Sequence, residues 1–224
     1  MDWLALQISL KLALVSTLIL VLFGLPVARI ISHRQFRGRA LVESLIAMPL
    51  VLPPTVIGFY LLLLFNPDSL VGKWVFSVTG EQLVFRFSGL VVGSIVYSLP
   101  FALQPMIRAF DAIPTHLREA AWCSGLSPIR TFFKIELILA LPGITTAAIL
   151  SFAHTLGEFG VVLMLGGNIP GETRTLSIAI YDQVQMLNDA NAHKMSLLFV
   201  LLALLITMCI YIVSHQSNRP SKIV

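Results

Sequence analysis

The feature that most constrains this chain is a series of apolar blocks, each long enough to cross a lipid bilayer. A membrane-spanning helix needs about 20 predominantly apolar residues. Only 12% of the residues are charged, about half the share of a soluble domain. The sequence therefore predicts an all-α polytopic membrane protein with about five transmembrane helices. The expected spans are Leu12 to Ile31, Leu41 to Phe65, Phe87 to Ile107, one within Ile135 to Leu165, and Met195 to Val213.

The basic residues indicate how these spans are oriented. Of the 15 Lys and Arg residues, most fall in the segments after the first, third and fifth spans. The positive-inside rule assigns that side to the cytoplasm, which puts the N-terminus outside and the C-terminus inside. The net charge of +4 then follows from membrane orientation and does not indicate nucleic-acid binding. The residues on this side are Arg29, Arg34, Arg37, Arg39, Arg108, Arg118, Arg130, Lys134, Arg219 and Lys222.

The fourth block is too long to be one straight span. Residues 128–166 look helical almost throughout, and an unbroken helix of that length would measure roughly 58 Å, about twice the hydrocarbon thickness. We therefore expect breaks at Pro142–Gly143 and at Gly157. The stretch from Phe159 to Gly167 is too short to span alone, and a sixth span would place the C-terminal cations outside.

Prolines inside the spans indicate where backbone hydrogen bonds are missing. The densest group lies in the second block, where Pro53 and Pro54 follow Pro49. Freed carbonyl groups are tolerated in a membrane where they face protein or a wet cavity. One interpretation is a kinked helix that lines a translocation path. The other is a packing kink that never contacts solute.

Ionisable residues are scarce inside the spans. Glu43 lies near the cytoplasmic end of the second span, and the two exceptions are His154 and Glu158, on either side of Gly157. Carriers driven by protons usually have acidic or histidine residues within their spans, so a proton-coupled carrier is disfavoured. Glu158 is interpreted in one of two ways. It is either a gate residue that holds a broken helix through hydrogen bonds or a carboxylate that reaches the outer interface.

The loop between the third and fourth spans, residues 111–134, contains two short helical units. The first begins near Pro114–Thr115 and ends at Gly125, a residue type that terminates helices. The second begins at Ser127–Pro128, which supplies an N-cap hydroxyl and a proline in the first turn. The sequence therefore predicts a tight corner between two helices on the cytoplasmic side.

The first of these helices has a face of mostly small residues. Spacings of three, four and three residues place four side chains on one side, those of Leu117, Ala120, Ala121 and Ser124. Small side chains allow another protein to approach closely, with Leu117 inserted as a knob and Glu119 beside the face. The helix either docks into a groove of a partner protein or lies on the surface of its own membrane domain.

This loop resembles the EAA motif of ABC importer permeases. The matching positions are Glu119–Ala121, Gly125, Ile135 and Leu137. The family commonly ends the motif with Leu-Pro, whereas this chain has Ile138 after Leu137, so the start of the following helix is left open. The resemblance implies coupling to an ATPase subunit through Leu117, Glu119, Ala120, Ala121 and Gly125.

Residues 50–54, 156–160 and 168–175 further resemble the permease family of molybdate ABC importers. The resemblance implies the type I ABC importer permease fold, in the inner membrane, as a single permease domain over residues 1–224 with its core at about 10–214. The partners implied are a second copy of the chain, two cytoplasmic ATPase subunits and an external molybdate-binding protein.

The same resemblance suggests where solute would pass. The candidate translocation path and gate residues are Pro53, Pro54, Gly157, Glu158, Phe159 and Gly160. Residues 158–194 are expected to form an extracytoplasmic gate and loop region. Within it, Asn168, Glu172 and Arg174 are candidates for contact with the external anion or its binding protein. Arg174 either steers the anion or contacts the binding protein, or it is a solvated cation paired with Glu172, and the backbone N–H groups of residues 166–168 are a weaker anion site.

The chain has no Walker P-loop pattern, so it cannot cradle ATP in the usual way. We expect it to bind no cofactor, with ATP and Mg²⁺ held by the partner ATPase, and to be non-catalytic itself. Ser151 and His154 are helical neighbours that could suggest an intramembrane hydrolase, but no G-x-S-x-G elbow accompanies them. A stand-alone channel or secondary carrier is the other alternative, and it would not require the helix at Glu119.

Molybdate and tungstate are nearly identical tetrahedral dianions, so the sequence predicts either as the substrate, with the smaller sulfate as an alternative. No arginines are stacked inside the predicted spans. We therefore hypothesise that the path lacks a tight anion site and that selectivity resides mainly in the binding protein.

Overall fold

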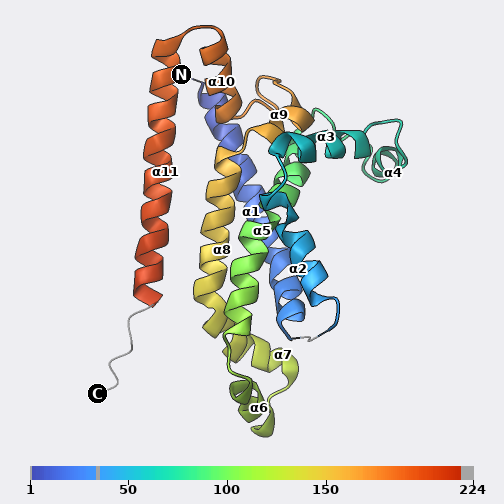
Figure 1. The fold of residues 1–224 in the computed structure, drawn as a ribbon, viewed down its shortest axis with the longest axis vertical. Helices are drawn as coiled ribbons and strands as arrows, with labels where there is room; N and C mark the ends of the chain where they lie inside the picture. Colours follow the sequence, from blue (N-terminus) through green and yellow to red (C-terminus); the bar gives the residue numbers. More distant parts are fainter. Residues whose placement is uncertain (1, 34–35, 218–224) are drawn as a thin grey trace.

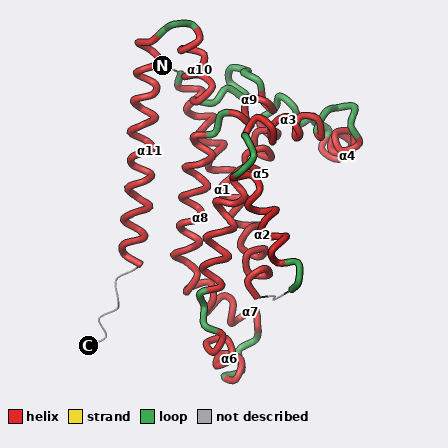
Figure 2. The backbone as a smooth tube through the Cα atoms, viewed as in Figure 1, coloured by secondary structure: helices red, strands yellow, loops and turns green. Residues whose placement is uncertain are grey.

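The structure is a computed structural model that describes residues 2–33 and 36–217. Within these ranges the chain forms helices and connecting loops, with no strands (Figures 1 and 2). The elements are α1 (Trp3–His33), α2 (Arg39–Ala47), the 3₁₀ turn η1 (Met48–Leu50), α3 (Pro54–Leu64), α4 (Leu70–Thr79), α5 (Phe87–Asp111), α6 (Thr115–Cys123), α7 (Pro128–Thr131), the π-helical turn η2 (Phe132–Glu136), α8 (Leu137–Gly157), α9 (Gly160–Gly166), α10 (Leu176–Gln185) and α11 (Asp189–Ser217).

Four helical segments in the described ranges are long and apolar enough to cross a membrane: α1, α5, the α7–η2–α8 segment and α11. A fifth crossing is possible if α2 and α3 are one broken span. This number agrees with the five predicted spans, although α1 begins at Trp3 and not near Leu12. Apolar periodicity marks the middle of a span better than its ends, where polar and apolar residues mix.

The second predicted span is not one kinked helix. It breaks after η1, and α3 leaves at an angle of 106° to the α2–η1 segment. Figure 1 shows α3 lying across the bundle while α2 runs roughly along it. Pro53 has extended backbone geometry and Pro54 occupies the first turn of α3, where its missing N–H costs little. The prolines therefore end one helix and begin another, which is a stronger effect than the predicted kink.

The core of the bundle is formed by α1, α5 and α8. Phe110 and Met106 of α5 are completely buried and pack with Ala140 and Ala147 of α8. Gly143 lies where α8 approaches α5 so closely that an added Cβ would collide with Ala109. The predicted break at Pro142–Gly143 is wrong, because α8 is continuous from Leu137 to Gly157. The glycine is required there for close packing and not for a change of direction.

The two ends of the bundle carry different elements (Figure 1). The α6–α7 corner lies at one end, together with the end of α1 and the start of α2. The short helices α3, α4, α9 and α10 lie toward the opposite end, where α1 and α11 begin. Helix α11 packs against α8 and α10, but only 11% of its apolar window is buried within the chain.

Candidate coupling and gate sites

The candidate coupling unit, defined here as α6, α7 and the corner between them, is built by local capping. Gly125 has a φ of +81°, a conformation that glycine adopts without steric cost. Its N–H donates to the Trp122 carbonyl (2.9 Å), and the next N–H, of Leu126, donates to the Ala121 carbonyl (3.0 Å). These two bonds form a Schellman motif that ends α6. They explain why the predicted helix end at Gly125 is confirmed.

Helix α7 begins as the sequence predicts. The Ser127 hydroxyl accepts a hydrogen bond from the Arg130 N–H (3.4 Å), and Pro128 occupies the first turn. The chain then continues through η2 into α8 without a further loop. The corner is therefore joined directly to a membrane-spanning helix. The sequence left open where that helix starts, and in the structure α8 begins at Leu137.

The coupling unit is mostly exposed, and it extends from the end of the bundle in Figure 1. Leu117, Glu119 and Ala120 are exposed, whereas Ala121 is buried, with 5% of its surface accessible. The predicted small-residue face is thus divided, because Ala121 turns inward and Ala120 outward. Three further apolar side chains of this end are exposed and were not predicted, because they lie between the matched positions of the motif: Trp122 (49% exposed), Ile129 (71%) and Phe133 (60%).

Toward the opposite end, the break at Pro53–Pro54 meets the predicted break at Gly157, where α8 ends. A cleft of about 510 Å³ lies between the start of α3, the middle of α5 and the junction of α8 with α9. It is lined by all the predicted path and gate residues except Pro53: Pro54, Gly157, Glu158, Phe159 and Gly160, with Thr55, Tyr97, Ala153 and His154. Segments about 100 residues apart in the sequence thus form one site, defined here as the gate cleft.

Two glycines bring α3 and α9 into contact beside the gate cleft. A Cβ added at Gly160 would lie 2.7 Å from the Cβ of Pro54, and one added at Gly58 would lie 2.7 Å from the Cβ of Met164. Real Cβ atoms essentially never approach so closely. Small residues permit such contacts between membrane helices. We name this pair of short helices the gate layer.

His154 is held by neighbours on α5 and does not form a dyad with Ser151. Its Nδ1 lies 2.8 Å from the Ser98 hydroxyl oxygen, and its ring stacks on Phe101 at 4.0 Å between centroids. The Ser151 hydroxyl is buried without a hydrogen-bond partner among the described residues. The arrangement therefore gives no support to a serine hydrolase.

Glu158 is buried and does not reach an outer interface. Only 4% of its surface is accessible, and both carboxylate oxygens lack a hydrogen-bond partner within the described part of the chain. The second interpretation from the sequence is therefore wrong for this conformation. The first interpretation, a gate residue that holds the broken helix, is not supported either, because the carboxylate accepts no hydrogen bond from a backbone group of the described residues.

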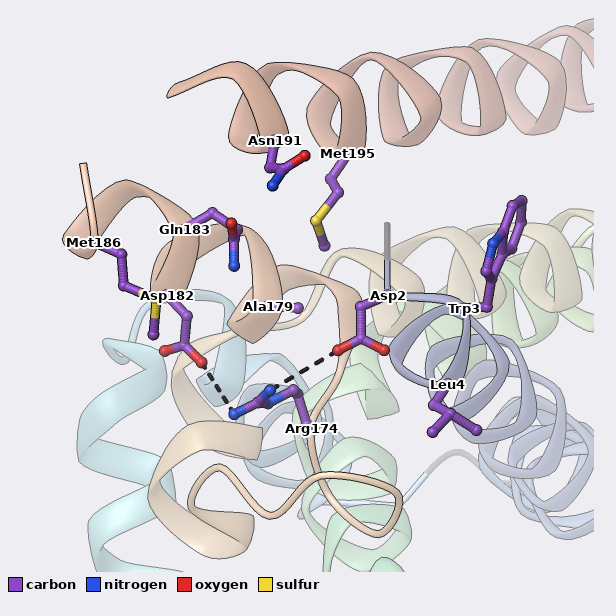
Figure 3. Close-up of a pocket in the computed structure, with 10 residues that line it drawn as sticks. All are labelled: Asp2, Trp3, Leu4, Arg174, Ala179, Asp182, Gln183, Met186, Asn191 and Met195. Atoms are coloured by element: carbon purple, nitrogen blue, oxygen red, sulfur yellow. Dashed lines mark ion pairs between the residues drawn. The ribbon is translucent and has the colours of Figure 1, made fainter. Parts of the chain in front are cut away.

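Arg174 lies in a network at the end of the bundle opposite the coupling unit (Figure 3). Its Nε donates to Asn168 Oδ1 (2.6 Å), and its terminal nitrogens lie 3.4 Å from Asp182 Oδ2 and 3.9 Å from Asp2 Oδ2. Arg174, Asp182 and Asp2 line a pocket of about 480 Å³ between the start of α1, α10 and α11. The network ties the start of α1 to the loop after α9 and to α10.

Glu172 is not the partner of Arg174. It pairs instead with Arg86, at 3.4 Å and with both side chains largely exposed, so the predicted pair is wrong. The loop folds back because the Arg174 N–H donates to the Ile169 carbonyl (3.0 Å), which separates the two side chains. The suggested backbone anion site is also incomplete, since the Gly167 N–H donates to Leu163 (2.9 Å).

The fold and these sites define a class of protein: a polytopic helical membrane component with an exposed helical unit at one end and broken helices at the other. The family described as "Binding-protein-dependent transport system inner membrane component" matches residues 20–219. The chain belongs to this family and is a multi-pass protein of the inner membrane, a permease component of an ABC transporter.

Similar proteins agree with this placement. The molybdenum transport system permease protein ModB of Azotobacter vinelandii is 43% identical over 210 residues, 94% of this chain and 93% of the relative. ModB of Escherichia coli (strain K12) is 34% identical over 205 residues, 91% of this chain and 90% of the relative. A permease chain in the crystal structure of a bacterial alginate ABC transporter, in complex with an alginate pentasaccharide-bound periplasmic protein, superposes with a TM-score of 0.75. That match covers 98% of this chain and 79% of the other at 19% identity, so it supports the fold alone.

Proposed function

We propose that this chain is the membrane-spanning permease subunit of an ATP-driven importer of molybdate or tungstate. The observation that carries the proposal is the EAA-like segment on an exposed helical unit, in a chain 43% identical to a molybdenum permease. The sequence motif and the exposure are independent of each other. Together they favour a subunit driven by a partner over a channel or a self-sufficient carrier.

In this proposal the coupling unit lies in the cytoplasm and docks onto an ATPase subunit. The positive-inside rule and the arginines near the ends of α1 and α5 support this orientation. Leu117 and the exposed Trp122 supply apolar contact area, and Ala120 allows close approach. Each copy of the chain binds one ATPase subunit, which hydrolyses ATP with bound Mg²⁺.

The gate layer faces outward, and the path is completed by a second copy of the chain. The open gate cleft and the poorly buried α11 support a homodimer, because both leave surfaces that the single chain does not cover. ATP-driven approach of the ATPase subunits moves the coupling units, and α8 transmits the displacement to the gate layer. The transporter then alternates between two states whose populations are shifted by ATP and by the loaded binding protein.

An external molybdate-binding protein delivers the anion to the outer end, where the network around Arg174 contributes to its docking surface. The described spans offer no arginine cluster along the gate cleft, which supports a path without a tight anion site. Selectivity then rests mainly with the binding protein.

The test is reconstitution of the chain with the ATPase and binding protein of its own transport system in proteoliposomes. We expect ATP-dependent uptake of molybdate and tungstate, and calorimetry on the binding protein should rank both above sulfate. Preference for sulfate would contradict the substrate, and uptake that does not need ATP would contradict the class.

A further inference from the structure

Two carboxylates bracket the coupling unit, and each is bound to an arginine of the first two helices. Asp111 is the last residue of α5, before the unit, and Glu136 is the last residue of η2, after it. Arg39 Nη2 lies 2.6 Å from Asp111 Oδ2, and Arg29 Nε lies 2.6 Å from Glu136 Oε2. The chain thus enters and leaves the unit at points fixed to α2 and α1.

The two ion pairs differ in burial. The Glu136 side chain is completely buried, and both of its oxygens are occupied, because His33 Nε2 lies 3.2 Å from Oε1. Asp111 is 27% exposed, and its partner Arg39 is shared with Glu43 at 2.7 Å. Exposed pairs contribute little to stability, whereas removing one partner of a buried pair is strongly destabilising. The Glu136 pair is therefore the stronger attachment.

Aromatic contacts extend the buried pair to α5. The Arg29 guanidinium lies over the ring of Phe132, 4.7 Å from its centroid. Phe132 in turn packs near-parallel to Phe110 of α5, with centroids 6.4 Å apart. Such a cation–π contact adds to an ion pair when the group is partly desolvated. Helices α1 and α5 are thus both joined to η2, the turn through which α7 continues into α8.

We propose that Glu136 and Arg29 are positioning residues that fix the inner end of α1 to η2, so that displacement of the coupling unit reaches α1 and α8 together. This inference rests on the proposed function. A π-helical turn interrupts the regular hydrogen-bond ladder and is a natural point of bending. Without the buried pair, η2 would absorb the displacement before it reached the membrane-spanning helices.

The experiment uses the assembled transporter, with ATPase and binding protein, in proteoliposomes, and measures molybdate uptake and ATP hydrolysis on the same samples. Glu136→Gln keeps the size of the side chain and removes its charge. We expect the molybdate imported per ATP hydrolysed to fall about fivefold while ATP hydrolysis persists, because the weakened attachment lets η2 bend. The matched control is Asp111→Asn in the exposed pair, for which we expect a change of less than about twofold.

A double variant separates coupling from simple structural support. Arg29→Gln leaves the buried Glu136 without its main partner, and Arg29→Gln with Glu136→Gln removes that unpaired charge. We expect the double variant to regain thermal stability relative to Arg29→Gln, while the ratio of uptake to hydrolysis stays low. The proposal is overturned if the ratio is unchanged in assembled Glu136→Gln, or if it follows the thermal midpoint across these variants. Failure of the unaltered chain to bind any ATPase would contradict the proposed function instead.

Discussion

The coupling unit and the gate layer are both places where the path of a membrane helix is interrupted, but they are held by different forces. The coupling end is fixed by ion pairs, at Glu136 and Asp111, and by a hydrogen-bonded Schellman turn at Gly125. The gate layer contains no ion pair among the described residues, and its helices meet through Gly58 and Gly160. The buried carboxylate of the adjoining gate cleft, Glu158, has no hydrogen-bond partner among the described residues.

The difference follows from the surroundings of the two ends. At the coupling end only Glu136 is fully buried, and Arg29, Arg39 and Asp111 keep 30%, 26% and 27% of their side-chain surface exposed, which lowers the desolvation cost of pairing. Between apolar helices, packing of small residues is the less costly attachment. The ion pairs of the coupling end join specific atoms at short distances, so they resist displacement. Glycine contacts are short-ranged and non-directional, so two helices can separate without leaving unpaired charges behind. The comparison therefore predicts a stiff coupling end and a gate layer that opens by separation of α3 from α9.

The largest expected effect is loss of the ATPase from the complex. Ala120 is exposed on α6, so Ala120→Arg should leave the fold intact while it obstructs close approach of a partner. We expect co-purification of the ATPase subunit and ATP-dependent uptake both to be lost. The same substitution at Ala112, which is exposed but precedes α6, is the matched control. Retention of the ATPase by Ala120→Arg would show that the partner binds elsewhere.

The gate layer is tested by two glycines three residues apart. A Cβ at Gly160 would press on Pro54, a rigid ring. A Cβ at Gly157 would lie 3.8 Å from its nearest neighbour among the described residues, Phe199, which is an ordinary contact. Overpacking typically costs about 1–3 kcal/mol. We expect Gly160→Ala to reduce uptake by about tenfold, since tenfold corresponds to about 1.4 kcal/mol, and Gly157→Ala to have little effect.

Uptake and thermal unfolding should be measured for both variants in the same preparation. Equal behaviour of Gly157→Ala and Gly160→Ala would mean that close contact between α3 and α9 does not matter for transport. The comparison between a stiff coupling end and a separable gate layer would then lose its basis.

A smaller effect is expected at the corner of the coupling unit. No atom lies within 4 Å of a Cβ built at Gly125, so only its φ of +81° opposes substitution. Left-handed geometry costs a residue with a Cβ about 1–2 kcal/mol, and asparagine tolerates it better than valine. We expect Gly125→Val to lower uptake several-fold and Gly125→Asn to lower it less. If both variants reduce uptake equally, the side chain obstructs docking and the turn geometry is not the cause.

The sequence predicted the parts of this fold that depend on local chemistry. Apolar length located the spans, and Gly125 with Ser127–Pro128 located the corner, because capping depends on adjacent residues. It could not predict the 106° turn at Pro53, since proline permits several geometries and contact between α3 and α9 selects one. The role of Gly143 was misjudged for the same reason, because its neighbour Ala109 belongs to a distant segment.

The candidate sites were predictable as segments but not as contacts. Pro54 and Gly160 were both identified, yet nothing in the sequence indicates that they touch. Glu136 was missed altogether, because a single glutamate beside an apolar span resembles an interfacial residue. Only the fold brings Arg29 and His33 of α1 within reach of it, more than 100 residues away in the sequence. Long-range pairing of charges has no periodicity that a sequence pattern can reveal.

The smallest effect is expected at Arg174, where the sequence left open a role in steering the anion. Its charge lies between Asp182 and Asp2, two carboxylates that offset the positive potential it would otherwise present to solvent (Figure 3). Steering requires an uncompensated field and weakens as salt screens it. We therefore expect Arg174→Gln to reduce stability by about 1 kcal/mol and to leave the salt dependence of uptake unchanged.

Initial uptake rates at low and high ionic strength distinguish the two roles of Arg174. If Arg174 attracts the anion, Arg174→Gln should make the uptake rate depend less on ionic strength. If Arg174 only holds the network together, the variant should lower the thermal midpoint and leave that dependence unchanged. Arg86→Gln is the matched control, because Arg86 is 58% exposed and pairs with a single carboxylate among the described residues, Glu172 at 3.4 Å. A weaker dependence of uptake on ionic strength for Arg174→Gln but not for Arg86→Gln would mean that the charge of Arg174 acts on the anion outside the network. The outer end would then take part in anion capture, and selectivity would not rest with the binding protein alone.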